Sequence, residues 1–156
     1  MERLTANFTL SEFLASETAD DLGIKNEPNE RELANIRIVA TRLQRVRDFL
    51  NEALKQRVSI KITSGFRCEA LNKAVGGSST SDHRTGMAAD FKAIRADGKA
   101  VSPRVLMRVV EELGDFDQAI FYPGQTRIHV GYGSAGRRQL LQKEQGGYGP
   151  YSEGPA

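Results

Sequence analysis

Two segments far apart in the chain carry both of its histidines. His83 lies in Ser81-Asp82-His83-Arg84-Thr85-Gly86-Met87-Ala88-Ala89-Asp90, and His129 lies in Arg127-Ile128-His129-Val130. The first segment also places Asp90 seven positions after His83. Two imidazole nitrogens and a carboxylate oxygen suit zinc, and three protein ligands leave a fourth coordination position open, as in catalytic zinc sites. We therefore predict that His83, Asp90 and His129 share one zinc ion.

Such a site requires ligands that converge from separate parts of the chain. Zinc with three protein ligands lowers the pKa of a bound water to about 7, which supplies hydroxide at neutral pH. Gly86 and the small residues after it would let the backbone turn tightly between the first two ligands. In the competing interpretation, His83 is a surface loop residue, His129 a half-buried strand residue and Asp90 a polar strand end. Spacing alone leaves both interpretations open, because His-x6-Asp is a loose pattern.

Composition favours one globular domain. The chain has 156 residues, 39% of them hydrophobic and 27% charged, which are ordinary values for a soluble protein with a single core. The net charge of +2 is too weakly basic to argue for an anionic partner such as a cell wall or a nucleic acid. The single cysteine, Cys68, excludes an intramolecular disulfide and a cysteine-rich structural zinc site. We interpret it as a small buried or half-buried side chain.

The sequence carries no recognisable export or membrane signal. Residues 1–6 lack a basic region followed by a long apolar run, so no signal peptide is predicted. No stretch approaches the ~18 consecutive apolar residues of a membrane span. We therefore expect synthesis in the cytoplasm and no membrane partner. If the protein acts outside the cell, something other than its own signal takes it there.

Helices dominate the N-terminal part of the chain. Residues 9–12 form a capping-box pattern that predicts a short helix to about Ala19, followed by a loop over residues 20–26. A second box at residues 29–32 opens the longest amphipathic helix, whose apolar residues recur every three or four positions as far as Leu54. The arginines of this helix are interpreted as a solvated face.

The rest of the chain alternates strands with short helices. The expected elements are a strand over 58–63, helical turns over 69–75, a flexible loop over 76–80, a strand over 88–93, a helix from Ser102-Pro103 to Gly114, and an antiparallel hairpin of 118–122 with 127–132. Residues 145–156 are rich in glycine and proline and predict a flexible tail. With no internal repeat, residues 1–144 form one α+β domain, a small antiparallel sheet with flanking helices.

The first ligand segment resembles a known signature. Ser81-x-His83-x-x-Gly86-x-Ala88-x-Asp90 is similar to that of the zinc D-Ala-D-Ala carboxypeptidases and phage L-alanyl-D-glutamate endolysins, of the peptidase M15A type. The similarity continues in family order over about residues 8–132, through Phe8-Thr9-Leu10-Ser11-Glu12-Phe13, Ile62-Thr63-Ser64-Gly65-Phe66-Arg67, Asn72-Lys73-Ala74-Val75-Gly76-Gly77-Ser78, Phe116-Asp117-Gln118 and Ile128-His129-Val130. The resemblance implies the Hedgehog/DD-peptidase fold.

The resemblance also implies roles for individual residues. His83, Asp90 and His129 would bind Zn²⁺. Arg67 would stabilise the oxyanion formed when water attacks the peptide carbonyl, since a fixed guanidinium offers charge where charge develops. Outside the family context, Arg67 is equally a surface arginine after a turn.

Three further polar residues belong to the resembling segments. Ser81 is expected to anchor either the substrate or its own loop. Asp117 and Asp82 are candidate hydrogen-bond acceptors for the imidazoles, because a metal-bound histidine generally donates its other ring N–H to an acceptor.

One departure from the family pattern concerns the general base. The resembling enzymes carry a carboxylate just before the last histidine, whereas residues 122–128 contain none. Tyr122 stands at one of the family's positions for this group. A tyrosine with a pKa of ~10 is a poor base, although it can donate a hydrogen bond. Catalysis would then rely on the zinc centre alone or on a carboxylate from elsewhere, or it would be slow or absent.

Three functions compete at this stage. The first is a zinc peptidase that cuts peptidoglycan stem peptides, as a phage or prophage product acting after lysis or on a virion. The second is a zinc-binding module of the same fold that recognises the cell wall or belongs to a virion or tail, and the missing carboxylate favours it. The third, nucleic-acid binding, rests only on the arginines of the long helix, and no binding motif supports it.

Overall fold

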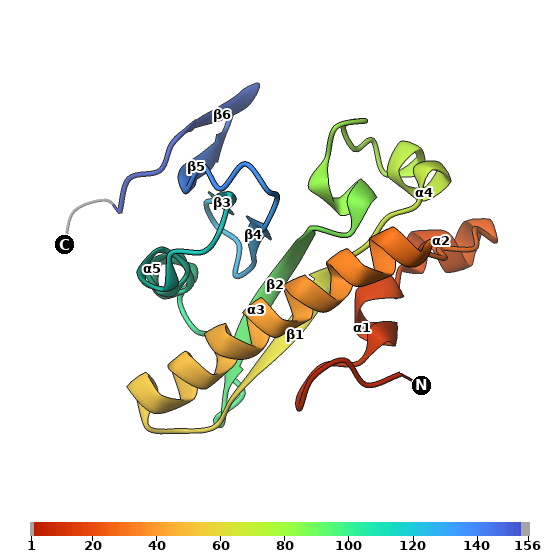
Figure 1. Ribbon diagram of the computed structural model, residues 1–156. Coiled ribbons are helices and arrows are strands. Elements are labelled where there is room, and N and C mark those ends of the chain that lie inside the picture. The colour runs from red at the N-terminus through yellow and green to blue at the C-terminus, as the bar shows by residue number, and fades with distance from the viewer. Residues whose placement is uncertain (1, 154–156) are drawn as a thin grey trace.

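The computed structural model describes residues 2–153 of the chain, which fold into one sheet with flanking helices (Figure 1). The helices are α1 (Leu10–Leu14), α2 (Glu17–Leu22), α3 (Glu30–Leu54), α4 (Glu69–Ala74), α5 (Pro103–Leu113) and the 3-10 helix η1 (Asp82–Thr85). The strands are β1 (Val58–Ser64), β2 (Ala88–Arg95), β3 (Gln118–Phe121), β4 (Ile128–Gly131), β5 (Gln139–Glu144) and β6 (Gly147–Pro150). The α+β class expected from the sequence is confirmed.

The six strands lie in the order β1-β2-β4-β3-β5-β6, and the sheet is mixed. The hairpin expected near residues 118–132 is present as β3 and β4, which pair antiparallel. The sheet is antiparallel as expected, except that β5 pairs with β3 in parallel. Residues 132–138 carry the chain back past β3, so that β5 starts at the same end as β3.

The expected flexible tail also differs from the structure. Residues 147–150 form β6, which pairs antiparallel with β5 and extends the sheet. A turn with Gly146 at φ 79° joins the two strands, so here glycine makes a hairpin. The end of that tail, residues 154–156, lies outside the described residues.

The helix expected to run to Ala19 is two helices. Ala15 has extended backbone angles (φ −63°, ψ 134°) and ends α1. The hydroxyl of Ser16 then accepts a hydrogen bond of 3.1 Å from the amide of Ala19 and caps α2. The helix α2 continues to Leu22, where a loop was expected, and Gly23 ends it with φ 66°.

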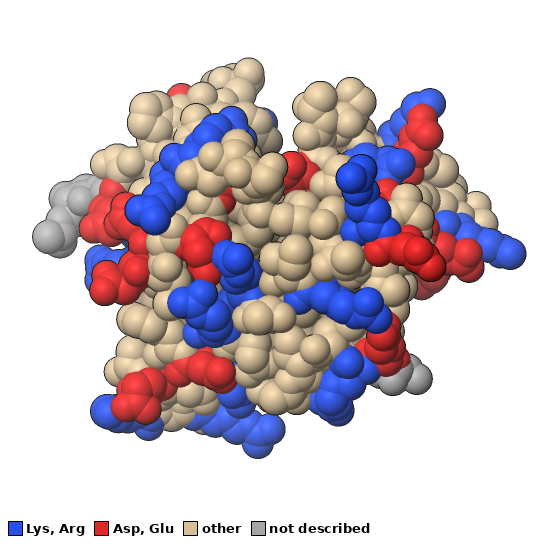
Figure 2. Space-filling view, viewed as in Figure 1, with Lys and Arg blue, Asp and Glu red and all other residues tan. Residues whose placement is uncertain are grey.

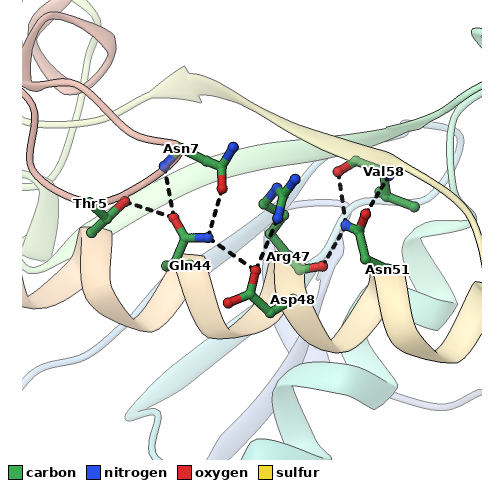
Figure 3. A network of polar contacts seen from close by, with 7 residues as sticks. All are labelled: Thr5, Asn7, Gln44, Arg47, Asp48, Asn51 and Val58. Carbon is green, nitrogen blue, oxygen red and sulfur yellow. Dashed lines mark hydrogen bonds and ion pairs between the residues drawn. The ribbon is translucent and has the colours of Figure 1, made fainter.

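Helix α3 is the long amphipathic helix that the sequence predicts. Polar side chains at its start, in its middle and near its end form hydrogen bonds that hold it in place. At its start, Asn29 and Glu32 form the predicted capping box. In its middle, the Gln44 side chain bonds the N-terminal segment at Thr5 (Figure 3). Further on, Asn51 bonds the backbone of Val58 at the start of β1. The helix is thereby fixed against the sheet.

The core lies between the helices and one face of the sheet. Helix α3 contacts β1 and β2, whereas α5 contacts β3 and β4. Because side chains alternate along a strand, Phe91 of β2 and Ile128 of β4 point into this core and are fully buried. Their neighbours Asp90 and His129 therefore point to the opposite face. The alternation of side chains along β2 and β4 thus decides which face of the sheet can hold a polar site.

Charge is spread over the visible surface without a large region of one sign (Figure 2). Within residues 2–153, no helix combines the length and the apolar character that a membrane span needs.

Candidate metal centre

Strand register brings two of the predicted ligands together. In the antiparallel pair of β2 and β4, Asp90 lies directly opposite His129. Directly opposed residues share one face of the sheet and have closely spaced Cβ atoms. The result is a contact of 2.9 Å between Oδ1 of Asp90 and Nδ1 of His129.

His83 comes from η1, where the sequence predicted the end of a flexible loop. The hydroxyl of Ser81 caps η1 by accepting a hydrogen bond of 3.3 Å from the amide of His83. Gly86 ends η1 at φ 83°, and a Cβ there would lie 2.7 Å from the carbonyl oxygen of Glu32. Only glycine fits this tight turn, as expected from the sequence. His83 is 2% exposed, so its interpretation as a surface residue is wrong.

The three donor atoms converge on one point. Nε2 of His83 lies 3.2 Å from Oδ1 of Asp90 and 3.2 Å from Nδ1 of His129. Tetrahedral zinc with bonds of 2.0–2.1 Å would hold its ligand atoms about 3.4 Å apart. The observed spacings of 2.9–3.2 Å are close to that value. Among the described residues, these form the group that could hold a metal ion.

The protonation of His83 is fixed from the other side of its ring. Nδ1 lies 2.7 Å from the carbonyl oxygen of Gly65, which can only accept, so Nδ1 carries the hydrogen. Burial lowers the pKa of His83, which favours the neutral ring. Nε2 then turns a lone pair toward the carboxylate oxygen of Asp90. Two electron-rich atoms at this distance repel unless a proton or a metal ion lies between them, so the donor set fits a metal ion.

Asp90 supplies negative charge to this cluster. Burial by itself would raise the pKa of its carboxyl, but the contacts with His129 and His83 outweigh burial and hold the pKa well below its ordinary value. The carboxylate is therefore charged at neutral pH. Its second oxygen, Oδ2, lies 3.4 Å from a guanidinium nitrogen of Arg127.

Arg67 lies beside the cluster and lines the same cleft. Its backbone amide donates a hydrogen bond of 2.9 Å to the carbonyl oxygen of His83. Its side chain lines the same cleft as Asp90 and His129, and Nε has no hydrogen-bond partner among the described residues. Burial lowers the pKa of Arg67, while the charge of Asp90 raises it. An arginine remains charged under such shifts, so the guanidinium places positive charge beside any ligand in the cleft.

Tyr122 also faces the cleft, on the same side of the sheet as Asp90. Burial and the nearby charge of Asp90 raise the pKa of the phenol. At neutral pH the hydroxyl therefore keeps its proton and can donate but not act as a base. The guanidinium of Arg127 lies over the ring, 3.9 Å from its centre. Arg127 had no predicted role, because its contacts with Asp90 and with the Tyr122 ring depend on the path of the chain between β3 and β4.

The two aspartates expected beside the imidazoles have different surroundings. Asp117 binds Arg137 at 3.0 Å through each carboxylate oxygen, and it contacts no histidine. Asp82 lies closer to the cluster. A Cβ on Gly131 would be 2.9 Å from Oδ2 of Asp82 and 3.7 Å from Nε2 of His129, so both groups lie over this glycine.

The cluster lies at the floor of an open cleft of about 680 Å³. One side is formed by the loop from Gly76 to Ser81, and the other by Leu141 of β5 and Tyr148 of β6. Figure 2 shows a hollow between the part of the molecule that contains β6 and the part that contains α4. A ligand in the cleft would reach Arg67, Tyr122 and the three donor atoms together.

The fold and the site thus define an α+β domain in which a buried His–Asp–His cluster under a cleft could hold one metal ion. The family model of Peptidase M15 matches residues 6–130, and the chain belongs to the peptidase M15 family. The match includes His83, Asp90, His129 and Arg67, and ends before β5. None of the curated proteins compared with the chain matches it.

Proposed function

We propose that this protein is a zinc-dependent peptidase that hydrolyses peptidoglycan stem peptides, at a D-Ala-D-Ala or an L-Ala-D-Glu bond. The observation that carries the proposal is the convergence of His83, Asp90 and His129 within 2.9–3.2 Å in a chain of the peptidase M15 family. Two neutral nitrogens and one carboxylate are the donor set of zinc sites that keep a position open for chemistry. When bound there, zinc would act as a Lewis acid and activate water.

The chain's own residues would then position and stabilise the reacting peptide. Arg67 lines the cleft, and its guanidinium would hold the carbonyl oxygen as negative charge develops on it. Tyr122 keeps its proton and would donate a second hydrogen bond to the same region. Ser81 caps η1, which supports a role in holding the loop that carries His83, and it also lines the cleft, which supports a role in binding the substrate.

The general base of the proposed reaction must come from the groups that line the cleft. Among the described residues that line the cleft, the carboxylates are Asp82 and Asp90. Asp90 is assigned to the metal, and Asp82 lies over Gly131 toward His129. This arrangement favours a second candidate function, a zinc-binding module of the same fold with weak or no turnover. Such a module would recognise wall peptide or take part in a virion or tail.

The test is release of amino groups from purified peptidoglycan. The proposed peptidase should release them in proportion to enzyme, stop when a chelator is added, and resume when zinc is restored. A protein that binds zinc and wall peptide without releasing amines would identify the binding module. A peptidase of this kind would act on the wall after cell lysis or as a virion component.

A further inference from the structure

The cleft over the cluster does not end at the three donor atoms. A second cleft of about 320 Å³ adjoins it, between the start of α2 and the end of β1. The two clefts share Arg67, Val75 and Asp90, which lie where they meet. The side chain of Asp90, which carries one of the three donor atoms, therefore borders both clefts.

The edge of the sheet shapes the second cleft. Strand β1 is the first strand of the sheet, and its register with β2 shifts between Ile62 and Ser64. Such a bulge leaves Thr63 without a partner in β2 and bends the strand end. Across the cleft, Ser16 and Thr18 stand at the start of α2. Thr63, Ser16 and Thr18 give the rim of the second cleft small polar side chains.

The two clefts extend from the cluster in different directions. The first leads toward the β5–β6 hairpin, where Tyr148 is 54% exposed and Leu141 lines the wall. The second leads toward Thr63 and Thr18, at the opposite end of the strand order. A chain that crosses the cluster would thus find space before and after the bond next to the metal.

We infer that the site accepts a peptide that continues on both sides of the cleaved bond, and that the protein is an endopeptidase and not a carboxypeptidase. This inference rests on the proposed function. An enzyme that removes one terminal residue needs a wall just beyond the reacting bond to reject longer chains. Here that position opens into a second cleft. In the reaction, an internal C–N bond breaks, the hydroxyl of water joins the carbonyl carbon, and its hydrogen goes to the leaving amine.

The experiment compares the N-acetylated stem pentapeptide L-Ala-D-Glu-L-Lys-D-Ala-D-Ala with the same peptide amidated at its C-terminus. An endopeptidase should cut both at an internal bond, with kcat/KM values within about threefold, because neither end lies at the reacting bond. Mass spectrometry identifies the products. Release of D-Ala alone, with a loss of a hundredfold or more on amidation, would overturn the inference.

Variants of the cleft walls test the geometry in the same assay. Thr63→Trp should fill the second cleft and lower kcat/KM at least tenfold, whereas Ser59→Trp, on the exposed part of the same strand and outside both clefts, should not. Tyr148→Ala should weaken binding from the other side, seen as a raised KM. Unchanged kinetics in Thr63→Trp would contradict the inference, provided that zinc content and melting temperature match those of Ser59→Trp.

If neither peptide is cut, the proposed function fails, and the inference about the clefts can still be decided. The intact pentapeptide is then titrated into the zinc-loaded protein while amide chemical shifts are recorded. Shifts at both Thr18 and Thr80, one from each cleft, would support a bound chain that spans the cluster. Shifts in one cleft only, or in neither, would overturn it.

Discussion

The carbonyl oxygen of Gly65 lies 2.7 Å from Nδ1 of His83 and decides which nitrogen of that ring faces the metal centre. Gly65 follows directly after β1, so the sheet edge orients an imidazole that comes from η1. Outer hydrogen bonds of this kind fix the tautomer of a metal-binding histidine and raise its basicity. Gly65 therefore orients a predicted metal ligand although it is not a ligand itself.

Gly65→Ala should therefore weaken metal binding without touching a ligand. A Cβ at this position would lie 2.8 Å from the Cα of Phe13 and closer still to its carbonyl oxygen, both backbone atoms that cannot turn away. We expect a loss of about 1–3 kcal/mol in stability and a zinc affinity lower by about 10–100-fold.

Chelator competition and denaturant unfolding measure these two quantities. Gly147→Ala is the matched control, since a Cβ there meets no atom within 4 Å. Equal zinc affinity in Gly65→Ala and the control would show that the Gly65 carbonyl does not orient His83.

Arg67→Lys should keep zinc and lose turnover. The lysine retains the charge but not the planar N–H groups that reach across the cleft. Removing one donor to an oxyanion costs about 10²–10³ in kcat. Steady-state kinetics with metal analysis of the same sample tests this, and a variant with normal kcat would remove Arg67 from the mechanism.

Tyr122→Glu should raise activity or leave it unchanged if this position is that of the general base. Burial holds the proton on the phenol, whereas a carboxylate can accept one near neutral pH. Tyr122→Phe separates the hydroxyl from the ring that Arg127 covers. A large loss of kcat in both variants would instead show that the tyrosine hydroxyl has a role of its own.

The charged carboxylate of Asp117 should raise the free energy of unfolding at neutral pH, and this contribution should be lost in acid. Its side chain is 3% exposed, and the hydrogen bonds from Arg137 lower its pKa below the ordinary value. The folded state thus holds the charged form more strongly than the unfolded chain, whose pKa is ~3.9. The stabilisation is complete above that pH and is lost as the pH falls through the lower folded pKa.

The urea midpoint of unfolding, measured from pH 6 to pH 3, tests this dependence. Between pH 5 and pH 3 the midpoint of the wild type should fall more steeply than that of Asp117→Asn. Parallel curves would mean that the pair with Arg137 contributes nothing to stability.

Local patterns predicted much of the fold because they act over a few residues. The capping box of Asn29 and Glu32 and the steps of three and four that follow it describe α3 to its last residue, Leu54. The alternation along β1 and the Ser102-Pro103 helix start were equally direct. The grouping of His83 with Asp90 and His129 followed from residue type and resemblance.

What the sequence missed depends on contacts between distant segments. No residue of β5 or β6 is buried, so no apolar pattern marks these strands, and β5 forms by pairing with β3. The contact of Arg127 with Asp90 requires the register of β4 on β2. The carboxylate of Asp117 is taken by Arg137, a partner twenty residues away that no local pattern indicates.

Metal content of the purified protein, measured by mass spectrometry of the elements, tests the central claim most directly. The account predicts about one zinc per chain in the wild type and in Asp117→Asn. It predicts none in His83→Ala, with the fold of each protein checked by circular dichroism. Zinc that stays bound after His83→Ala, or a folded wild type that takes up no divalent metal, would contradict the account.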